Sequence, residues 1–289
     1  MSATPEIPVA GHVVTSRLRI RGGDTLIAIS AAILAVIVLV AILAPLLAPY
    51  EPNQTDILHA SLPPSSSHLL GTDELGRDIF SRLLYGARLS LLGPTIITVL
   101  AVFLGTLTAI YSVWIGGRFD AAVARGLDIL FAFPSLLIAI IAVSIFGAGF
   151  VAPVLALVIA YLPYIARVVR SVALRERNLA YIDSCRMMGF SGIRICGRHI
   201  LPNVRGMIAA QGTISFASAL LDLAALSFIG LGPQPPTSDW GSMVSEGSNE
   251  LLNGAPAQSL AASGAIVLTV VLVNLIGERL ATRAARVVR

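Results

Sequence analysis

The sequence predicts an all-α integral membrane protein with six transmembrane helices and both termini in the cytoplasm. Three observations lead to this fold class. Only 12% of the 289 residues are charged, whereas soluble domains carry about 25%. Apolar residues make up 56% of the chain and gather in six long runs. The basic residues are concentrated in alternate connecting segments, as membrane topology requires.

Each apolar run is long enough, or nearly long enough, to cross a bilayer, which takes about 20 helical residues. The first run exceeds the roughly 7–15 residues of a signal-peptide core and lacks a small-residue cleavage pattern, so we expect a retained helix. The six runs lie at residues 25–48, 89–114, 127–148, 150–169, 206–231 and 260–277.

All twenty basic residues are arginine, and their placement predicts the orientation. Seventeen fall in the termini and the segments expected inside, and only Arg77, Arg82 and Arg88 fall outside. Cytoplasmic loops carry such an excess of basic residues. We therefore divide the chain into a cytoplasmic tail (1–24), a first transmembrane helix (25–48), an extracytoplasmic loop (49–88), a five-helix core (89–277) with an inner segment at 170–205, and a cytoplasmic tail (278–289).

The extracytoplasmic loop begins with proline and serine and then gains helical spacing. Thr72 or Asp73 can cap a helix, and Leu75, Ile79 and Leu83 follow at helical intervals. We expect an amphipathic helix here, which lies on the outer membrane face or against the bundle, or serves only as an interfacial elbow.

Other features of the apolar runs and their outer connections remain open. Pro134 in the third run favours a bend, and Trp240 fits an interfacial aromatic. Asp222, in the outer half of the fifth run, is costly in a membrane. It either contributes to a pathway or gate, or lies near enough to the surface to be solvated.

The inner segment predicts a helix that continues from the fourth apolar run, then a tight turn and a second, short helix. Gly189 is suited to end the first helix, Ser191 to cap the second, and Pro202 to stop it. Such a structure is either a solvated loop or a docking site for a partner.

The chain lacks the usual chemistry of an enzyme. Without any lysine it has no phosphate-binding G-x-x-x-x-G-K-[ST] loop. Its four histidines are scattered, and Cys185 and Cys196 have no zinc or redox spacing, so we expect reduced thiols, no metal and no bound cofactor. The basic pI reflects the inner arginines, so we expect no nucleic-acid partner.

The inner segment resembles the loop E-A-A, three residues, Gly, nine residues, I-x-L-P of ABC importer permeases. Here Asp183-Ser184-Cys185 is followed after three residues by Gly189, and after nine more by His199-Ile200-Leu201-Pro202. The E-A-A triplet and the isoleucine position differ. Three further stretches resemble the C-type subunit of the dipeptide/oligopeptide branch: HLLGTDELGRDIFSRLLYGARLSL (68–91), LDILFAFPSLLIAI (127–140) and LSFIGLGPQPPTSDWGSM (226–243).

The resemblance implies a type I ABC importer permease in a bacterial inner or plasma membrane, importing di- or oligopeptides. It implies that a separate cytoplasmic ATPase, which uses ATP and Mg²⁺, docks on the inner segment, with one or two copies present. It also implies a second homologous permease forming a heterodimer, and an extracytoplasmic peptide-binding protein. The residues assigned to coupling are Asp183, Ser184, Cys185, Gly189, His199, Leu201 and Pro202.

Two alternatives remain at this point. The same machinery in this branch also imports nickel or other chelates, which the inner segment cannot distinguish. An ion-coupled secondary transporter would need buried acids along a pathway, for which Asp222 and Asp128 are the candidates, and an internal repeat, which we do not find.

Overall fold

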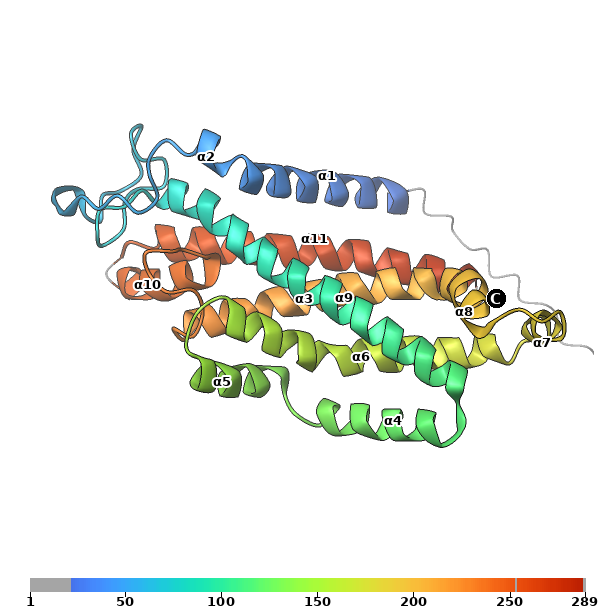
Figure 1. Cartoon of the computed structure of the whole chain (residues 1–289). Helices are drawn as coiled ribbons and strands as arrows, with labels where there is room; N and C mark the ends of the chain where they lie inside the picture. Colours follow the sequence, from blue (N-terminus) through green and yellow to red (C-terminus); the bar gives the residue numbers. More distant parts are fainter. Residues whose placement is uncertain (1–21, 253, 288–289) are drawn as a thin grey trace, which may run out of the picture.

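The computed structural model describes residues 22–252 and 254–287, and over these residues the chain is helical, without a β-strand. Five long helices run side by side along one direction, namely α1, α3, α6, α9 and α11 (Figure 1). We call the end that holds α10 and the 48–78 loop the outer end, and the end that holds α7 and α8 the inner end. The predicted tail at 1–24 lies, up to residue 21, outside the described residues.

The number of spans agrees with the prediction. Five described helices or helical stretches are long and apolar enough to cross a membrane, and a bent pair, α4 and α5, makes a sixth if it counts as one span. α1 (Gly22–Ile42) is followed by a single turn, α2 (Ala44–Leu47), and packs against α3 and α11. Many of its large apolar side chains are exposed, as a lipid-facing helix requires.

The second long helix, α3 (Ile79–Ile115), begins later than predicted. Asp78, rather than Thr72 or Asp73, is its N-cap, and the Asp78 carboxylate accepts hydrogen bonds from the Ser81 N–H (2.8 Å) and hydroxyl (2.7 Å). Residues 72–78 form a closed turn bridged by Thr72 and Asp78. The expected amphipathic helix from residue 72 is therefore wrong, because the polar side chains at helical spacing bind the turn instead of facing a membrane surface.

The third predicted span is two helices. α4 (Gly117–Phe131) and α5 (Ser135–Phe146) meet at a break with an angle of 78°. Pro134 lies in this break and cannot donate the backbone hydrogen bond that would continue α4. The bend that this proline favoured is present, and it divides the span.

Two further long helices complete the centre of the bundle. α6 (Val151–Arg177) packs on α3, and Gly105 permits their close approach. A Cβ at this glycine would lie 3.1 Å from the Leu162 carbonyl oxygen. α9 (Leu201–Phe228) packs on α3, α6 and α11 (Ala257–Val287), so α11 extends beyond the predicted sixth span through most of the expected C-terminal tail.

The outer connection after α9 contains a helix, α10 (Trp240–Leu252), that packs on α9 and α11. Trp240 is 2% exposed, and its indole N–H donates to the Leu83 carbonyl at 3.1 Å. The interfacial position predicted for Trp240 is therefore wrong, because the side chain closes the apolar core beneath α10 and has its polar atom satisfied inside the protein.

Candidate functional site

The inner end of the bundle is formed by residues 178–203, which we call the inner knob. α6 ends at Arg177, and two short helices, α7 (Ala180–Met187) and α8 (Gly192–Ile195), follow around a turn. The first helix, predicted to continue from the fourth apolar run to Gly189, is interrupted at residues 178–179. The predicted glycine turn and the helix after it are present.

Gly189 ends α7 in a Schellman motif. Its φ is +78°, which favours glycine. The Gly189 N–H donates to the Arg186 carbonyl at 2.9 Å, and the Phe190 N–H donates to the Cys185 carbonyl at 3.1 Å. These two bonds satisfy carbonyls left free at the helix end. Ser191 is the N-cap residue of α8 as predicted, but its side chain makes no capping hydrogen bond.

Pro202 does not stop a helix, which corrects the prediction. Residues 196–200 form a π-helical turn in which the Leu201 N–H donates to the Cys196 carbonyl, and α9 follows directly. Pro202 occupies the first turn of α9, where a missing N–H costs little. The wider π-helical turn ahead of the proline changes the hydrogen-bond register, so the chain passes from the inner knob into α9 without a loop.

The other residues of the predicted motif differ in how far they are exposed. Asp183 and Ser184 are exposed, and Asp183 pairs with Arg186 at 3.3 Å. Cys185 is 6% exposed, and its sulfur lies 4.0 Å from the His199 Nε2. Leu201 is 38% exposed.

The cysteines behave as predicted for structural thiols. Both are free, and Cys185 belongs to an apolar cluster of the inner knob. Burial raises the pKa of the Cys196 thiol, so this group stays protonated at neutral pH. No three metal-binding side chains come together in the described part of the chain.

A polar junction that the sequence analysis missed ties the inner knob to two long helices. Glu176, near the end of α6, is 9% exposed. Its Oε2 accepts hydrogen bonds from the Tyr181 hydroxyl of α7 and from the Asn203 amide of α9, each at 3.0 Å. Asn203 also donates to the Tyr181 hydroxyl at 3.1 Å. These three residues connect α6, α7 and α9, although they lie up to 27 positions apart and share no sequence pattern.

A second connection joins the inner knob to α3. The Arg186 guanidinium lies 5.0 Å from the Trp114 ring centroid, and Gly192 packs directly on this ring. A Cβ at Gly192 would lie 2.2 Å from the indole nitrogen, so only glycine permits this contact without a shift. The inner knob is therefore held by α3, α6 and α9 together.

The far side of the inner knob presents apolar side chains to the exterior. Met187 is 86% exposed, Met188 64% and Ile193 89%. They flank the Gly189 turn, at its two ends. Exposed apolar groups on a rigid, polar-rimmed element mark a contact surface. None of the three belongs to the predicted motif, although two adjacent methionines before a turn glycine are a sequence signal for such a surface.

Asp222 lies within the membrane-spanning part of α9 and contacts two other helices. Its Oδ2 accepts hydrogen bonds from the Ser135 hydroxyl of α5 at 2.8 Å and from the Tyr161 hydroxyl of α6 at 3.0 Å. Its side chain is half-buried. Ser135 is the first residue after the α4–α5 break, so Asp222 binds the broken span where it bends.

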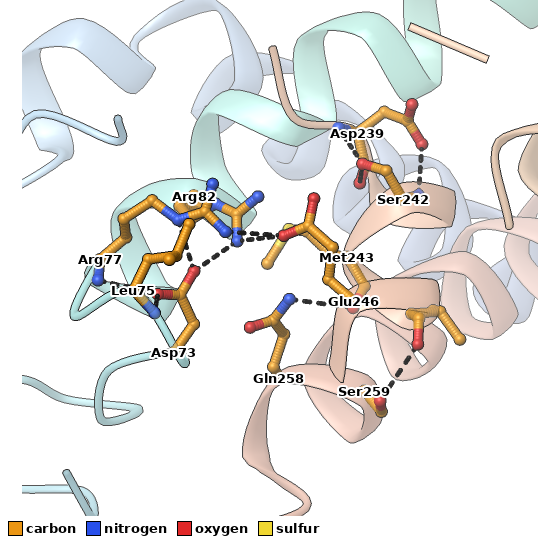
Figure 2. A network of polar contacts seen from close by, with 11 residues as sticks. Asp73, Leu75, Arg77, Arg82, Asp239, Ser242, Met243, Glu246, Gln258 and Ser259 are labelled. Atoms are coloured by element: carbon orange, nitrogen blue, oxygen red, sulfur yellow. Dashed lines mark hydrogen bonds and ion pairs between the residues drawn. The ribbon is translucent and has the colours of Figure 1, made fainter. Parts of the chain in front are cut away.

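The outer end holds a buried charge network (Figure 2). Arg82 is fully buried, and its Nη1 lies 2.6 Å from an Asp73 oxygen and 2.9 Å from a Glu246 oxygen. Arg77 lies 2.7 Å from Asp73 and 2.8 Å from Glu246. The network joins the loop before α3 to α10. Two of the three outer arginines are therefore inside the protein rather than in solvent.

Glu250, on α10, borders this network and is 4% exposed. Burial, together with the negative charges of Asp73 and Glu74, raises the pKa of Glu250 to about 7. Its Oε1 has no hydrogen-bond partner among the described residues. The outer end thus contains a carboxyl group that binds a proton near neutral pH.

Comparisons with known proteins agree with this arrangement. Residues 101–289 match the family model "Binding-protein-dependent transport system inner membrane component", and residues 24–64 match "N-terminal TM domain of oligopeptide transport permease C". A solved structure of the MetNI methionine ABC transporter in an inward-facing conformation is similar with a TM-score of 0.55 at 18% identity, covering 73% of this chain and 98% of that chain. This likeness shows the permease fold that the sequence predicted.

Several curated proteins are similar over most of their length. A putative peptide transport system permease protein of Brucella suis is 40% identical over 80% of this chain and 77% of its own. The glutathione transport system permease protein GsiD of Pectobacterium atrosepticum is 40% identical over 75% and 72%. The di/tripeptide transport system permease protein DppC of Pseudomonas aeruginosa is 38% identical over 80% and 78%.

Proposed function

Because this chain belongs to the family of binding-protein-dependent transport system inner membrane components, we propose that it is the permease subunit of an ATP-driven importer of di- and oligopeptides. The chain forms half of the translocation pathway. The names of the relatives, which are peptide, di/tripeptide and glutathione permeases, favour a peptide cargo.

The observation that carries this proposal is the inner knob. It projects exposed Met187, Met188 and Ile193 from a turn that the Gly189 motif holds rigid. Such a surface suits a groove on a separate cytoplasmic ATPase, with one or two copies in the complex. The nucleotide and Mg²⁺ bind to that ATPase, because this chain has no lysine for a phosphate-binding loop.

The geometry provides a route for the ATPase motion. When the ATPases close, the inner knob moves with them, and its junctions to α3, α6 and α9 pass the displacement to the membrane helices. A second, homologous permease completes the pathway in a heterodimer, and an extracytoplasmic peptide-binding protein delivers the cargo at the outer end. We place the complex in the inner or plasma membrane of a bacterium.

Purification from the native membrane tests the assembly. The tagged chain, isolated in mild detergent, should bring with it a second permease and an ATPase, identified by mass spectrometry. A chain variant with Met187, Met188 and Ile193 replaced by aspartate should still retain the second permease and lose the ATPase. A wild-type chain that purifies alone, where other membrane complexes survive, contradicts the proposal and favours an ion-coupled transporter.

Uptake tests the cargo. Cells carrying the complete system should accumulate a labelled dipeptide, and deletion of this chain should abolish the uptake until the gene is restored. Labelled nickel, free or chelated, is measured in the same cells. Nickel uptake without dipeptide uptake would show that the chain belongs to an importer of nickel and not of peptides.

A further inference from the structure

Asp222 differs from the other aspartates on the helices that border α6. Asp120 of α4 is paired with Arg170, whose two guanidinium nitrogens lie 2.7 and 2.5 Å from its oxygens. Asp128 of α4 is paired with Arg167 at 2.7 Å. Asp222 has only the hydroxyl groups of Ser135 and Tyr161, and no described cation forms an ion pair with it. One negative charge is therefore uncompensated.

This charge lies in an unfavourable place. Asp222 is six residues before Phe228, the last residue of α9, and so about 9 Å along the helix axis from its outer end. An ionised carboxylate at the centre of a bilayer costs about 2.5–3.5 kcal/mol on insertion scales, and such residues usually mark a substrate or ion pathway. The hydroxyl groups satisfy one oxygen but supply no positive charge.

The second oxygen of Asp222 is available to a visiting group. Both hydroxyl bonds are made to Oδ2, whereas Oδ1 has no hydrogen-bond partner among the described residues and is not one of their fully buried unpartnered atoms. The Asp222 side chain itself is half-buried. The carboxylate is thus fixed in orientation by α5 and α6 and keeps one oxygen without a partner.

We propose that Asp222 is a binding site for the ammonium group of the transported peptide, which supplies the missing cation during passage. The inference rests on the proposed peptide import and names a residue that recognises the substrate. A free amino terminus carries one positive charge and three N–H donors, which suits an oriented carboxylate with an open oxygen. The position at the α4–α5 break allows a bound peptide to bias the bend.

The test separates the effect of the Asp222 charge from the effect of the hydrogen bonds that join Asp222 to α5 and α6. In the complete transporter, Asp222→Asn removes the charge and retains an acceptor for both hydroxyl groups. The double variant Ser135→Ala with Tyr161→Phe removes the hydroxyl groups and retains the charge. Uptake is measured for a dipeptide and for its desamino analogue, and each rate is corrected for the affinity of the binding protein alone for that compound.

For wild type we expect faster uptake of the dipeptide than of the desamino analogue. Asp222→Asn should lower dipeptide uptake about tenfold and leave uptake of the analogue unchanged, because only the dipeptide has the ammonium group. Asp222→Glu should restore part of the preference. The double hydroxyl variant should keep the preference even if both rates fall.

Two results would overturn the inference. One is an unchanged dipeptide preference in Asp222→Asn. The other is loss of the preference in the double hydroxyl variant to the same extent, which would assign Asp222 a purely structural role. Two results with wild type would instead refute the proposed function itself: no peptide uptake at all, or uptake that stops when the proton gradient is removed at constant ATP.

Discussion

At the scale of single residues, Gly189 shows how backbone conformation determines the turn of the inner knob. Its φ of +78° belongs to the left-handed region, where a residue with a Cβ loses about 1–2 kcal/mol. No atom outside its immediate neighbours lies within 4 Å of a Cβ placed there. The requirement for glycine therefore comes from the backbone and not from packing.

Because the requirement for glycine is a backbone requirement, we predict that Gly189→Val impairs transport by disturbing the turn and not by a steric clash. Valine is β-branched and strained in the left-handed region, so we expect reduced peptide uptake and reduced recovery of the ATPase with normal membrane insertion. Gly189→Asn is the matched control, because asparagine tolerates this conformation, and it should transport close to wild type. Equal uptake by the two variants would show that the conformation of the turn has no role in coupling.

Glu250 makes a prediction about pH. Its carboxyl group ordinarily titrates near 4.5, and in the folded protein the pKa is raised to about 7. The folded state therefore binds this proton more tightly than the unfolded state. The contribution of this proton to the free energy of unfolding is complete below pH 4.5 and is lost as the pH rises through 7. We therefore expect the thermal midpoint of the purified complex to decrease as the pH is raised from 5.5 to 8.5, by about 2–4 °C for each kcal/mol of unfolding free energy that is lost.

Glu250→Gln should reduce this pH dependence, because glutamine keeps the shape without a titrating proton. The exposed Glu51 of the same end provides the control. Glu51→Gln should leave the pH profile as in wild type. A profile of Glu250→Gln that matches wild type would assign the pH dependence to other groups.

At the scale of the elements, we expect the Glu176 junction to make the inner knob move with the membrane helices. Asn203→Leu removes the amide that joins α9 to Glu176 and Tyr181. We expect more ATP hydrolysed per peptide transported, by a factor of about 10 or more, since a hydrogen bond to a charged group is worth about 1.5–3 kcal/mol. The measurement is the ratio of transport to ATP hydrolysis in reconstituted vesicles.

Two further variants separate transmission from simple destabilisation. Asn203→Gln keeps an amide donor and should recover part of the ratio. Asn178→Leu, at the other end of the inner knob, changes an exposed asparagine whose side chain makes no hydrogen bond to a described residue. It should behave as wild type. If Asn203→Leu lowers transport and hydrolysis in equal proportion, the junction only stabilises the complex.

The elements that sequence reasoning predicted well are those fixed by composition and by local backbone chemistry. Apolar length located the long helices, and Gly189 located the turn, because both effects act within a few residues. Pro202 misled the prediction, since a proline ends a helix only if the hydrogen-bond register is unbroken, and the π-helical turn before it was not visible in the sequence. Asp78 capped α3 instead of Asp73 because Arg77 and Arg82 bind Asp73.

The site was predicted only in part for a similar reason. The motif from Asp183 to Pro202 located the inner knob, yet the contacts that hold it come from distant residues. Glu176, Trp114 and Asn203 meet only in three dimensions, and no spacing relates them. Asp222 was recognised as unusual from its charge alone, whereas its partners Ser135 and Tyr161 depended on how three helices pack.

At the scale of the whole molecule, the two ends of the bundle have different construction. The outer end is closed by the buried ion pairs of Asp73 with Arg77 and Arg82, and the partly exposed Glu246 binds both arginines. Removing one partner of a buried pair costs about 3–5 kcal/mol. The inner end instead projects exposed apolar side chains from short helices. A rigid outer end and a protruding inner end suit a protein driven from one side of the membrane.

The arginine distribution predicts which side each end faces, and the chain offers a direct test. Its two cysteines, Cys185 and Cys196, are replaced by serine to give a background without thiols. A single cysteine is then introduced either at His59, in the outer loop, or at Ile193, in the inner knob. Both sites are accessible within the protein, with 59% of the His59 side chain and 89% of Ile193 exposed.

A membrane-impermeant thiol reagent should label His59→Cys in intact cells, or in spheroplasts where an outer membrane is present, and should label Ile193→Cys only after the membrane is opened. Labelling of Ile193→Cys from outside would reverse the orientation and remove the inner knob from the side where an ATPase could bind it.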